Sequence, residues 1–361
     1  MFNWHAGTLN IILPVGISFF TFQCLSYSID VYRKKIINLP SLSDFSLYVA
    51  FFPQLVAGPI VRAADFLPQL EKDVRPTSDD ILCGLRQFVF GFFKKVFIAD
   101  RVAIFVDTIF EGSGIYSGTT LWLAAIVYAI QIFCDFSGYS DMAIGLARMM
   151  GYHFNINFDS PYISLNITEF WRRWHISLSS WLKDYLYISL GGNRKGNIRT
   201  YANLLITMVL GGLWHGASWN FIFWGVWHGF WLAAHKIFMT SGIKFNHFFA
   251  KVLWNILSWA ATFMIVLIGW IFFRAATFCD SVNYIKRMFT LPDGIIWYEP
   301  FVIGIVAAMT IHHICIYFNI GDKLRTPKSG SFLYWYLLTL MTLVAIVFKR
   351  TEFQPFIYFQ F

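Results

Sequence analysis

The residue best suited to chemistry in this sequence is His215, a histidine inside a long segment without charge. The segment 203–229, NLLITMVLGGLWHGASWNFIFWGVWHG, contains no Asp, Glu, Lys or Arg. An ionisable side chain at membrane depth is costly and marks a functional site by default. Because an imidazole titrates near neutrality, His215 is suited to accept a proton as a general base. A second histidine, His175, lies in a segment of different character, FWRRWHISLSSWLKDYL.

A structural role is the alternative for His215, in which the imidazole bonds to a backbone carbonyl and holds helices together. Small neighbours favour the chemical role, because they leave room for another group to approach the ring; they are Gly211, Gly212, Gly216 and Ala217. The glycines, with Gly229, predict an open passage at His215, and close helix packing is the alternative for them. Either one helix continues through the glycines, or two half-helices meet at His215.

The other histidines favour structure over chemistry. His228 repeats the Trp-His-Gly pattern thirteen residues after His215, and we interpret it as structural. His228 and His235 are seven residues apart, which is too far along a helix for a shared metal. No nucleotide-binding glycine motif is present, so the sequence gives no sign of ATP or NAD.

The composition indicates a polytopic integral membrane protein. Of 361 residues, 57% are hydrophobic, 20% aromatic and 13% charged, whereas soluble domains carry roughly 25% charged residues. The net charge of +8 is assigned to loops that flank membrane spans, since basic residues gather on the cytoplasmic side. We expect no nucleic-acid partner, because there is no soluble basic domain.

Apolar segments divide the chain into nine to eleven expected membrane segments. The region 42–60 contains Pro53, Gly58 and Pro59 and is expected to be a broken or re-entrant helix. The clearest spans are expected at 9–31, 119–134, 201–217, 219–238, 252–273, 301–318 and 332–348. Basic clusters at Arg33–Lys35 and Arg194–Arg199 are expected to face the cytoplasm.

Two further segments carry charge within apolar sequence. The segment 81–110 contains Lys94, Lys95, Asp100 and Arg101, which favours an interface or an internal groove over contact with lipid. The span 119–134 is followed by Asp135 and Asp141, which bracket an expected Ser-Gly-Tyr-Ser linker.

An amphipathic helix is expected from Asn166 to about residue 188. Asn166 and Glu169 have the spacing of a capping box. One face carries Trp171, Trp174, His175, Leu178, Leu182 and Tyr185. Another carries Arg172, Arg173, Lys183 and Asp184. Such a helix lies at the membrane interface or in a cleft.

Several long motifs resemble those of the membrane-bound O-acyltransferases, in the bacterial branch that serves alginate O-acetylation, with the D-alanylation protein of teichoic acid as a cousin. The motifs are FFPQLVAGPIVR (51–62), FSGYSDMAIGLARMMG (136–151), FWRRWHISLSSWLKDYLYISLGGNR (170–194), LGGLWHGASWNFIFWGVWHG (210–229) and PFIYFQF (355–361). They occur in the family's order and cover essentially the whole chain.

The resemblance implies an all-α, multi-helix membrane bundle with an internal funnel or tunnel, formed by a single domain over residues 1–361. Relatives carry further hydrophobic segments before the stretch at 12–23, so the chain is expected to lack the family's most N-terminal helices. The resemblance assigns the catalytic histidine to His215 and the second family histidine to His175.

The resemblance also implies the reaction and its partners. Acetyl-CoA is the implied acyl donor, and no cofactor is expected to be bound tightly. The acetyl group moves toward an extracytoplasmic polysaccharide, directly or through a secreted or anchored hydrolase-fold acetyltransferase. The expected location is the bacterial inner membrane, in contact with lipid.

We therefore predict a membrane O-acyltransferase in which His215 is the general base and His175 orients the acceptor or shares the proton. The expected substrate-binding residues are Trp171, Arg173, Trp174, Lys183, Asp184 and Trp214. Arg173 and Lys183 are expected to attract the phosphates of the donor, or alternatively to anchor the helix at the interface. A transporter or flippase and a non-catalytic scaffold for a partner acetyltransferase are the rival functions.

Overall fold

The computed structural model describes residues 16–55, 58–240, 248–318, 320, 331–351 and 356. Residues 9–15 of the expected first span, and all of the motif 355–361 except Phe356, lie outside this set. The expected all-α fold is confirmed: within the described residues the regular elements are helices, with one isolated bridge between Tyr116 and Ile295.

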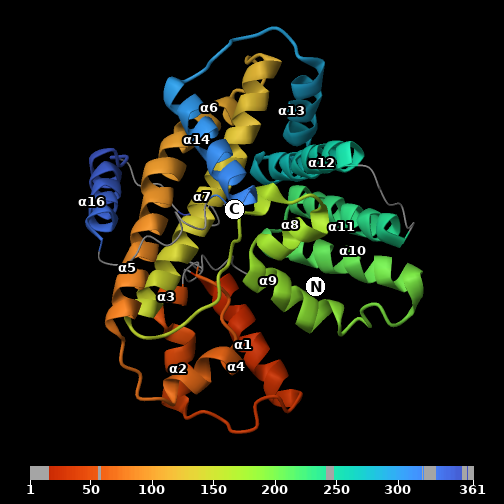
Figure 1. Cartoon of the computed structure of the whole chain (residues 1–361). Coiled ribbons are helices and arrows are strands. Elements are labelled where there is room, and N and C mark those ends of the chain that lie inside the picture. Colours follow the sequence, from red (N-terminus) through yellow and green to blue (C-terminus); the bar gives the residue numbers. More distant parts are fainter. Residues whose placement is uncertain are drawn as a thin grey trace, which may run out of the picture.

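The first half of the chain builds the elements around one long helix (Figure 1). They are α1 (Ile17–Tyr32), α2 (Leu42–Ala50), α3 (Phe52–Leu55), α4 (Ala63–Leu70), α5 (Ser78–Phe92), the π-helix η1 (Phe93–Ala99), α6 (Asp100–Glu111) and α7 (Gly118–Met149). The short α2 and α3 agree with the broken helix expected at 42–60.

The second half begins with short elements and continues with longer helices. They are η2 (Pro161–Ile163), α8 (Ile167–Arg173), α9 (Ile176–Trp181), the π-helix η3 (Leu182–Tyr187), α10 (Gly196–His215), α11 (Trp219–Thr240), α12 (Phe248–Arg274), α13 (Phe278–Thr290), α14 (Pro300–Tyr317) and α16 (Phe332–Val347).

Three described helices are long and apolar enough to cross a membrane: α7, residues 250–274 of α12, and α14. The apolar helix α16 is shorter, with 16 residues. The count of nine to eleven segments expected from sequence is larger than this. Two helices that were expected as spans, α10 and α11, have sufficient length, but their Asn, His and Trp residues lower the mean hydropathy.

Helix α7 is the central element, and it is one unbroken helix of 32 residues. The expected Ser-Gly-Tyr-Ser linker was wrong, because residues 137–140 are helical and lie on the packing face. A Cβ added at Gly138 would meet the backbone of Gly91 in α5, and one at Gly145 would meet that of Gly84. The glycines therefore let α5 and α7 approach closely instead of breaking the helix (Figure 1).

The charges of the segment 81–110 are directed toward α7. Lys95 forms ion pairs with Asp135 and, at 2.9 Å, with Asp100. Lys94 lies 2.5 Å from Asp141 and donates to the Ser137 hydroxyl at 2.8 Å. The expectation that these charges belong to an internal groove agrees with this packing, in which opposite charges neutralise one another away from solvent.

We expect Asp135→Asn to destabilise the protein strongly, because Lys95 then keeps only Asp100 in a largely buried site. Breaking a buried pair costs about 3–5 kcal/mol. Asp73→Asn is the matched control, since its partner Arg75 is 84% exposed and exposed pairs contribute about 0–1 kcal/mol. Thermal unfolding in detergent measures both variants, and equal effects would contradict a structural role for the buried pair.

The expected helix from 166 to 188 is broken at its centre, which was not predicted. Asn166 does begin it: the Asn166 side chain accepts from the Glu169 amide at 2.8 Å. The helix ends at Arg173, and His175 has φ 43° and ψ 57°, a left-handed conformation. Two long-range backbone bonds hold this kink: Asp159 N donates to Arg173 O and Ile176 N to Asn157 O, each at 2.9 Å.

The helices α10 and α11 form a tight antiparallel hairpin around His215. Helix α10 continues through Gly211 and Gly212, as one of the two sequence readings proposed, and ends at His215. After a short turn, α11 begins at Trp219. The histidine is thus fixed at the last position of a long helix, directly before the turn that joins α10 to α11.

Candidate functional site

His215 lines a large cavity. The cavity has a volume of about 1,090 Å³ and is lined by residues of α8, α9, η3, α10 and α11. The imidazole packs against aromatic rings on either side, with ring centroids 4.7 Å from Trp214, 5.3 Å from Trp224 and 5.0 Å from Phe273. These rings fix the orientation of the imidazole and limit its contact with water.

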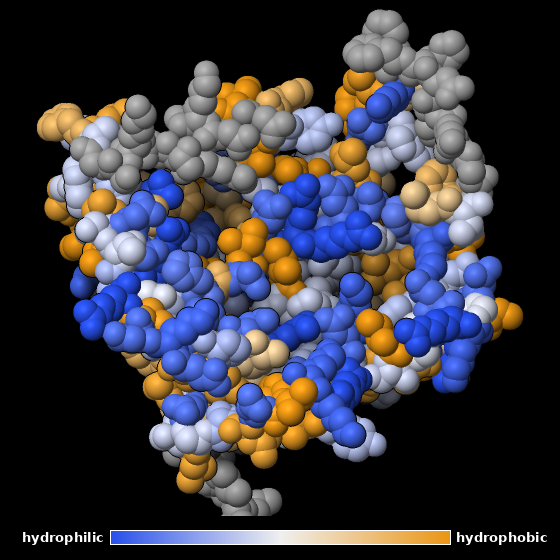
Figure 2. All heavy atoms as spheres, turned by 60° about the horizontal axis from the view of Figure 1, so that its bottom comes forward, coloured by the Kyte–Doolittle hydropathy of each residue, from blue (hydrophilic) through white to orange (hydrophobic). Residues whose placement is uncertain are grey.

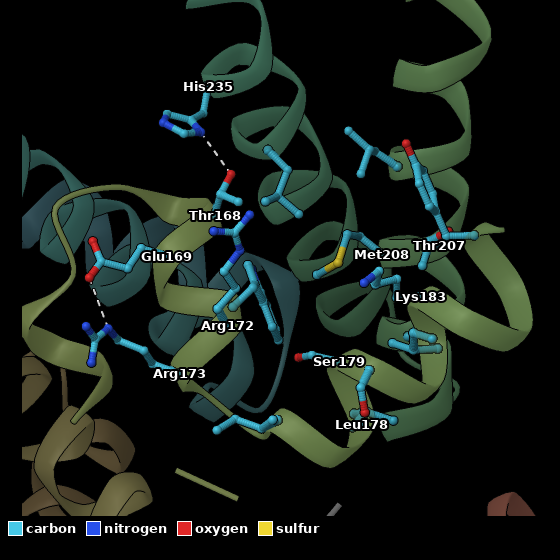
Figure 3. Close-up of a pocket in the computed structure, with 18 of the residues that line it drawn as sticks. Thr168, Glu169, Arg172, Arg173, Leu178, Ser179, Lys183, Thr207, Met208 and His235 are labelled. Atoms are coloured by element: carbon cyan, nitrogen blue, oxygen red, sulfur yellow. Dashed lines mark hydrogen bonds and ion pairs between the residues drawn. The ribbon is translucent and has the colours of Figure 1, made fainter. Parts of the chain in front are cut away.

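One side of the cavity is formed by α8 and α11. The Thr168 hydroxyl and His235 Nδ1 are 2.8 Å apart, which joins the two helices. Arg173 Nε donates to Glu169 at 3.0 Å, and Arg173 Nη1 contacts the Asp159 carboxylate at 3.0 Å (Figure 3). Two carboxylates thus neutralise Arg173, so its guanidinium is already paired within the protein and offers little charge to a ligand.

Three further cations border the cavity: Arg172, Lys183 and Lys236. Figure 3 shows Arg172 of α8 and Lys183 of η3 extending into the same space from opposite sides. Both side chains are exposed, and in the described part of the chain neither forms an ion pair with a carboxylate. Lys236 Nζ donates to the side-chain oxygen Oδ1 of Asn193 at 2.7 Å. This arrangement can attract an anionic ligand to the open end of the cavity.

The face below the cavity is rich in polar side chains. Figure 2, which brings the lower part of Figure 1 forward, shows a broad band of hydrophilic residues across this face, with hydrophobic residues around much of its rim. The C-terminal end of α1 belongs to this region: Arg33 donates to the Asp184 carbonyl at 3.2 Å and to the Ser189 hydroxyl at 2.8 Å.

His175 lies close to His215 but does not line the cavity. Its side chain is buried, and the residue is only 1% exposed. The Trp214 ring lies between the two imidazoles, with its centroid 6.4 Å from that of His175 and 4.7 Å from that of His215. The fold therefore brings together two histidines that are forty residues apart in sequence.

The other expected substrate-binding residues fall into separate environments. Trp171, Arg173 and Lys183 line the cavity. Trp174 is absent from the lining and packs in the core, 4.7 Å from the Trp270 ring. Asp184 points away from the cavity and forms an ion pair with Arg62 at 2.8 Å. The kink at His175 causes this separation, because it turns residues after Arg173 away from the face expected for a continuous helix.

The glycines near His215 are mostly packing residues, in contrast to the expected open passage. A Cβ at Gly212 would collide with the Phe221 carbonyl of α11, and one at Gly216 would meet the Phe221 ring. Gly229 approaches Leu205 of α10 in the same way. Gly211 differs, since it lines the cavity. A Cβ added at Gly211 would meet only the flexible side chain of Leu182, at 3.2 Å.

His228 is fully buried behind the cavity. Its ring centroid lies 5.2 Å from Trp171 and 4.9 Å from Trp224, and its Nε2 packs against Gly269 of α12. This position fits the structural interpretation. Sequence reasoning did not single out four residues of this region as site residues: Trp224, His235, Arg172 and Asn157. The repeated Trp-His-Gly pattern drew attention only to α11, the helix that contains Trp224.

Among the described residues, no group of three or more His, Cys, Asp or Glu side chains is arranged to hold a metal ion. The cavity lining combines imidazole, indole and cationic side chains with hydroxyls and two carboxylates.

A family model described as MBOAT, membrane-bound O-acyltransferase family, matches residues 18–277. The chain belongs to this family, which makes it a polytopic membrane protein and confirms the resemblance seen in the sequence motifs. The matched region contains both histidines and nearly all of the cavity-forming elements.

Relatives whose names state a function extend the comparison. The chain is 43% identical over 379 residues to a probable alginate O-acetylase AlgI of Pseudomonas putida, covering 98% of this chain and 76% of the relative. It is 50% identical to a probable alginate O-acetylase AlgI of Pseudomonas aeruginosa (78% of this chain, 52% of the relative). It is 41% identical to a peptidoglycan O-acetyltransferase of Helicobacter pylori (79% and 58%). The chain thus spans between about half and three quarters of these relatives.

Proposed function

We propose that this protein is an O-acyltransferase that moves acetyl groups from acetyl-CoA on the cytoplasmic side toward a polysaccharide outside the cell. The observation that carries the proposal is that His215 lines a cavity that is also lined by the cations Arg172, Lys183 and Lys236. The names of the relatives support transfer to a cell-surface polymer.

In the proposed reaction, His215 takes the proton from an attacking hydroxyl while the hydroxyl oxygen bonds to the thioester carbonyl carbon. The tetrahedral intermediate then collapses: the C–S bond breaks, and the imidazolium returns its proton to the departing thiolate. General-base catalysis of this kind contributes typically 10²–10⁴-fold. The hydroxyl belongs to the polysaccharide or to a secreted or anchored hydrolase-fold acetyltransferase.

The proposal is tested by acyl transfer from radiolabelled acetyl-CoA in liposomes that contain the purified protein. Label should appear in an added polysaccharide or partner acetyltransferase and should require this chain. A scaffold would instead support transfer only through a partner that is active by itself. A transporter or flippase would move an intact polymer without forming an acetyl ester. Either of those results would replace the proposal.

Arg172 and Lys183 are proposed to bind the phosphates of the donor. We expect Arg172→Ala and Lys183→Ala to raise the KM for acetyl-CoA several-fold with little change in kcat, since charge attraction acts on binding more than on the chemical step. The effect should shrink at high salt. Lys195→Ala is the matched control, because Lys195 is exposed and does not line the cavity. Unchanged KM values would favour interface anchoring by the two side chains.

The proposed location is the bacterial inner membrane, with Arg33–Lys35 and Arg194–Arg199 in the cytoplasm. The contacts of Arg33 with Asp184 and Ser189 support placing these basic segments on one side. In a variant without native cysteines, a cysteine at Lys35 or Lys195 should resist impermeant thiol reagents until cells are lysed. Labelling in intact cells would reverse the proposed orientation.

A further inference from the structure

His175 is held by an unusual set of hydrogen bonds from one asparagine. Asn157 is 1% exposed and lies in the segment that bridges the kink between α8 and α9. Its Oδ1 lies 3.1 Å from the Ser177 backbone nitrogen, 2.9 Å from the Ser177 hydroxyl and 3.2 Å from His175 Nδ1. Its Nδ2 donates to the Ser140 hydroxyl of α7 at 3.1 Å.

These contacts fix the position of the proton on the imidazole. A backbone N–H can only donate, so the Asn157 atom that faces Ser177 N must be the carbonyl oxygen. An amide oxygen can only accept, so the His175 nitrogen that faces it must carry hydrogen. The Ser177 hydroxyl does not compete as an acceptor for that hydrogen, since it already accepts from Ile60 N at 3.0 Å and lies 3.4 Å from Nδ1.

The opposite nitrogen of His175 is consequently a bare acceptor. In the described part of the chain, Nε2 is buried and has no hydrogen-bond partner. Leaving a buried acceptor unpaired is unfavourable, and so is the left-handed backbone at His175, where φ is 43°. Both features lie at one residue, beside the tryptophan that contacts His215.

We infer that Asn157 is a positioning residue that locks His175 as the neutral Nδ1–H tautomer, so that Nε2 stays unprotonated and the ring carries no positive charge close to His215. This inference rests on the proposed function. A neutral His175 leaves His215 free to take the proton from the acceptor hydroxyl, because no positive charge close to His215 opposes protonation of its ring.

The surroundings of His175 favour the neutral ring. The other groups that contact it are uncharged: Phe136 of α7 at 4.6 Å between ring centroids, Phe158, and Trp214 of α10. The titratable group that faces it from a neighbouring element is His215. Within the described residues Nδ1 faces the uncharged Asn157 amide and no carboxylate, so these residues give the ring no partner that would stabilise an imidazolium.

The variant that tests the inference is Asn157→Asp, which keeps the acceptor oxygen and the size of the side chain. The Ser140 hydroxyl can rotate to donate to the new oxygen, so the contacts within the kink are retained. The added negative charge at Nδ1–H favours the imidazolium, whose positive charge close to His215 makes that histidine a weaker base. We expect the acid limb of the pH–rate profile to move upward by about one to three pH units.

Asn203→Asp is the matched control. Asn203 is a fully buried asparagine of α10 whose Nδ2 donates to Gly192 O at 3.0 Å, and within the described residues its hydrogen bonds involve no histidine. This control should leave the pH profile in place, even if it lowers stability. An Asn157→Asp profile that coincides with that of the native protein would overturn the inference.

A direct measurement separates this inference from the proposed function. In protein labelled with ¹⁵N-histidine, the His175 resonances, assigned by their loss in His175→Gln, should show a protonated Nδ1 and an unprotonated Nε2. A protonated Nε2 would refute the tautomer lock whatever the activity. If the native protein transferred no acyl group, the proposed function would be wrong. The ¹⁵N resonances of His175 would still show whether Asn157 holds the ring in the Nδ1–H tautomer.

Discussion

Replacing His215 with alanine or glutamine is expected to lower acyl transfer by about 10²–10⁴-fold, because the attacking hydroxyl loses its general base. The imidazole sits among aromatic rings at the end of α10, where glutamine retains much of its volume and polarity. We therefore expect membrane insertion to remain near normal, particularly for His215→Gln. Initial rates with saturating acetyl-CoA, measured beside thermal unfolding in detergent, provide the test.

His235→Gln is the control for this prediction. His235 also lines the cavity, but its Nδ1 is occupied by a contact with the Thr168 hydroxyl at 2.8 Å. It should lose far less activity than His215→Gln. Native rates in both His215 variants, with normal protein levels, would remove His215 from the reaction and leave it as a structural histidine.

The second large effect is a loss of stability that we expect on substitution of Gly212 but not of its neighbour Gly211. Gly212→Ala should destabilise the protein by about 1–3 kcal/mol, because its Cβ meets the rigid backbone of α11 at Phe221. Gly211→Ala should be tolerated, since Leu182 can shift and alanine favours the helix. Unfolding temperature and yield in detergent compare the two variants.

A larger residue at position 211 tests whether the cavity gives access to His215, as distinct from whether the glycine is needed for helix packing. Gly211→Leu should reduce acyl transfer more than it reduces stability, because the side chain enters the cavity that leads to His215. Gly212→Leu should instead lose stability and activity together. If Gly211→Leu kept full activity, the cavity on that side of α10 would not be the route to the histidine.

Much of the site was accessible to sequence reasoning because its signals are local. An uncharged segment around His215 predicted a buried histidine, and the charges at Lys94 and Lys95 predicted an internal environment. The capping asparagine Asn166 marked the start of α8, and the proline-containing region 42–60 predicted a broken helix. Each of these depends on residue types within a few turns of one another.

The parts that sequence reasoning missed depend on contacts between distant segments. A hydrophobic period predicted one helix from 166 to 188, but Asn157 and Asp159 bind the backbone at the kink, and this places Trp174 in the core and Asp184 beside Arg62. A glycine in sequence indicates small size and flexibility, yet only its neighbour decides whether it opens a space, as at Gly211, or joins two helices, as at Gly212. The membrane character and the choice of His215 as the proposed general base follow from composition and local pattern, because burial of charge is costly wherever it occurs. The tautomer of His175 and the shape of the cavity follow from tertiary packing, because they require side chains that the chain brings together only on folding.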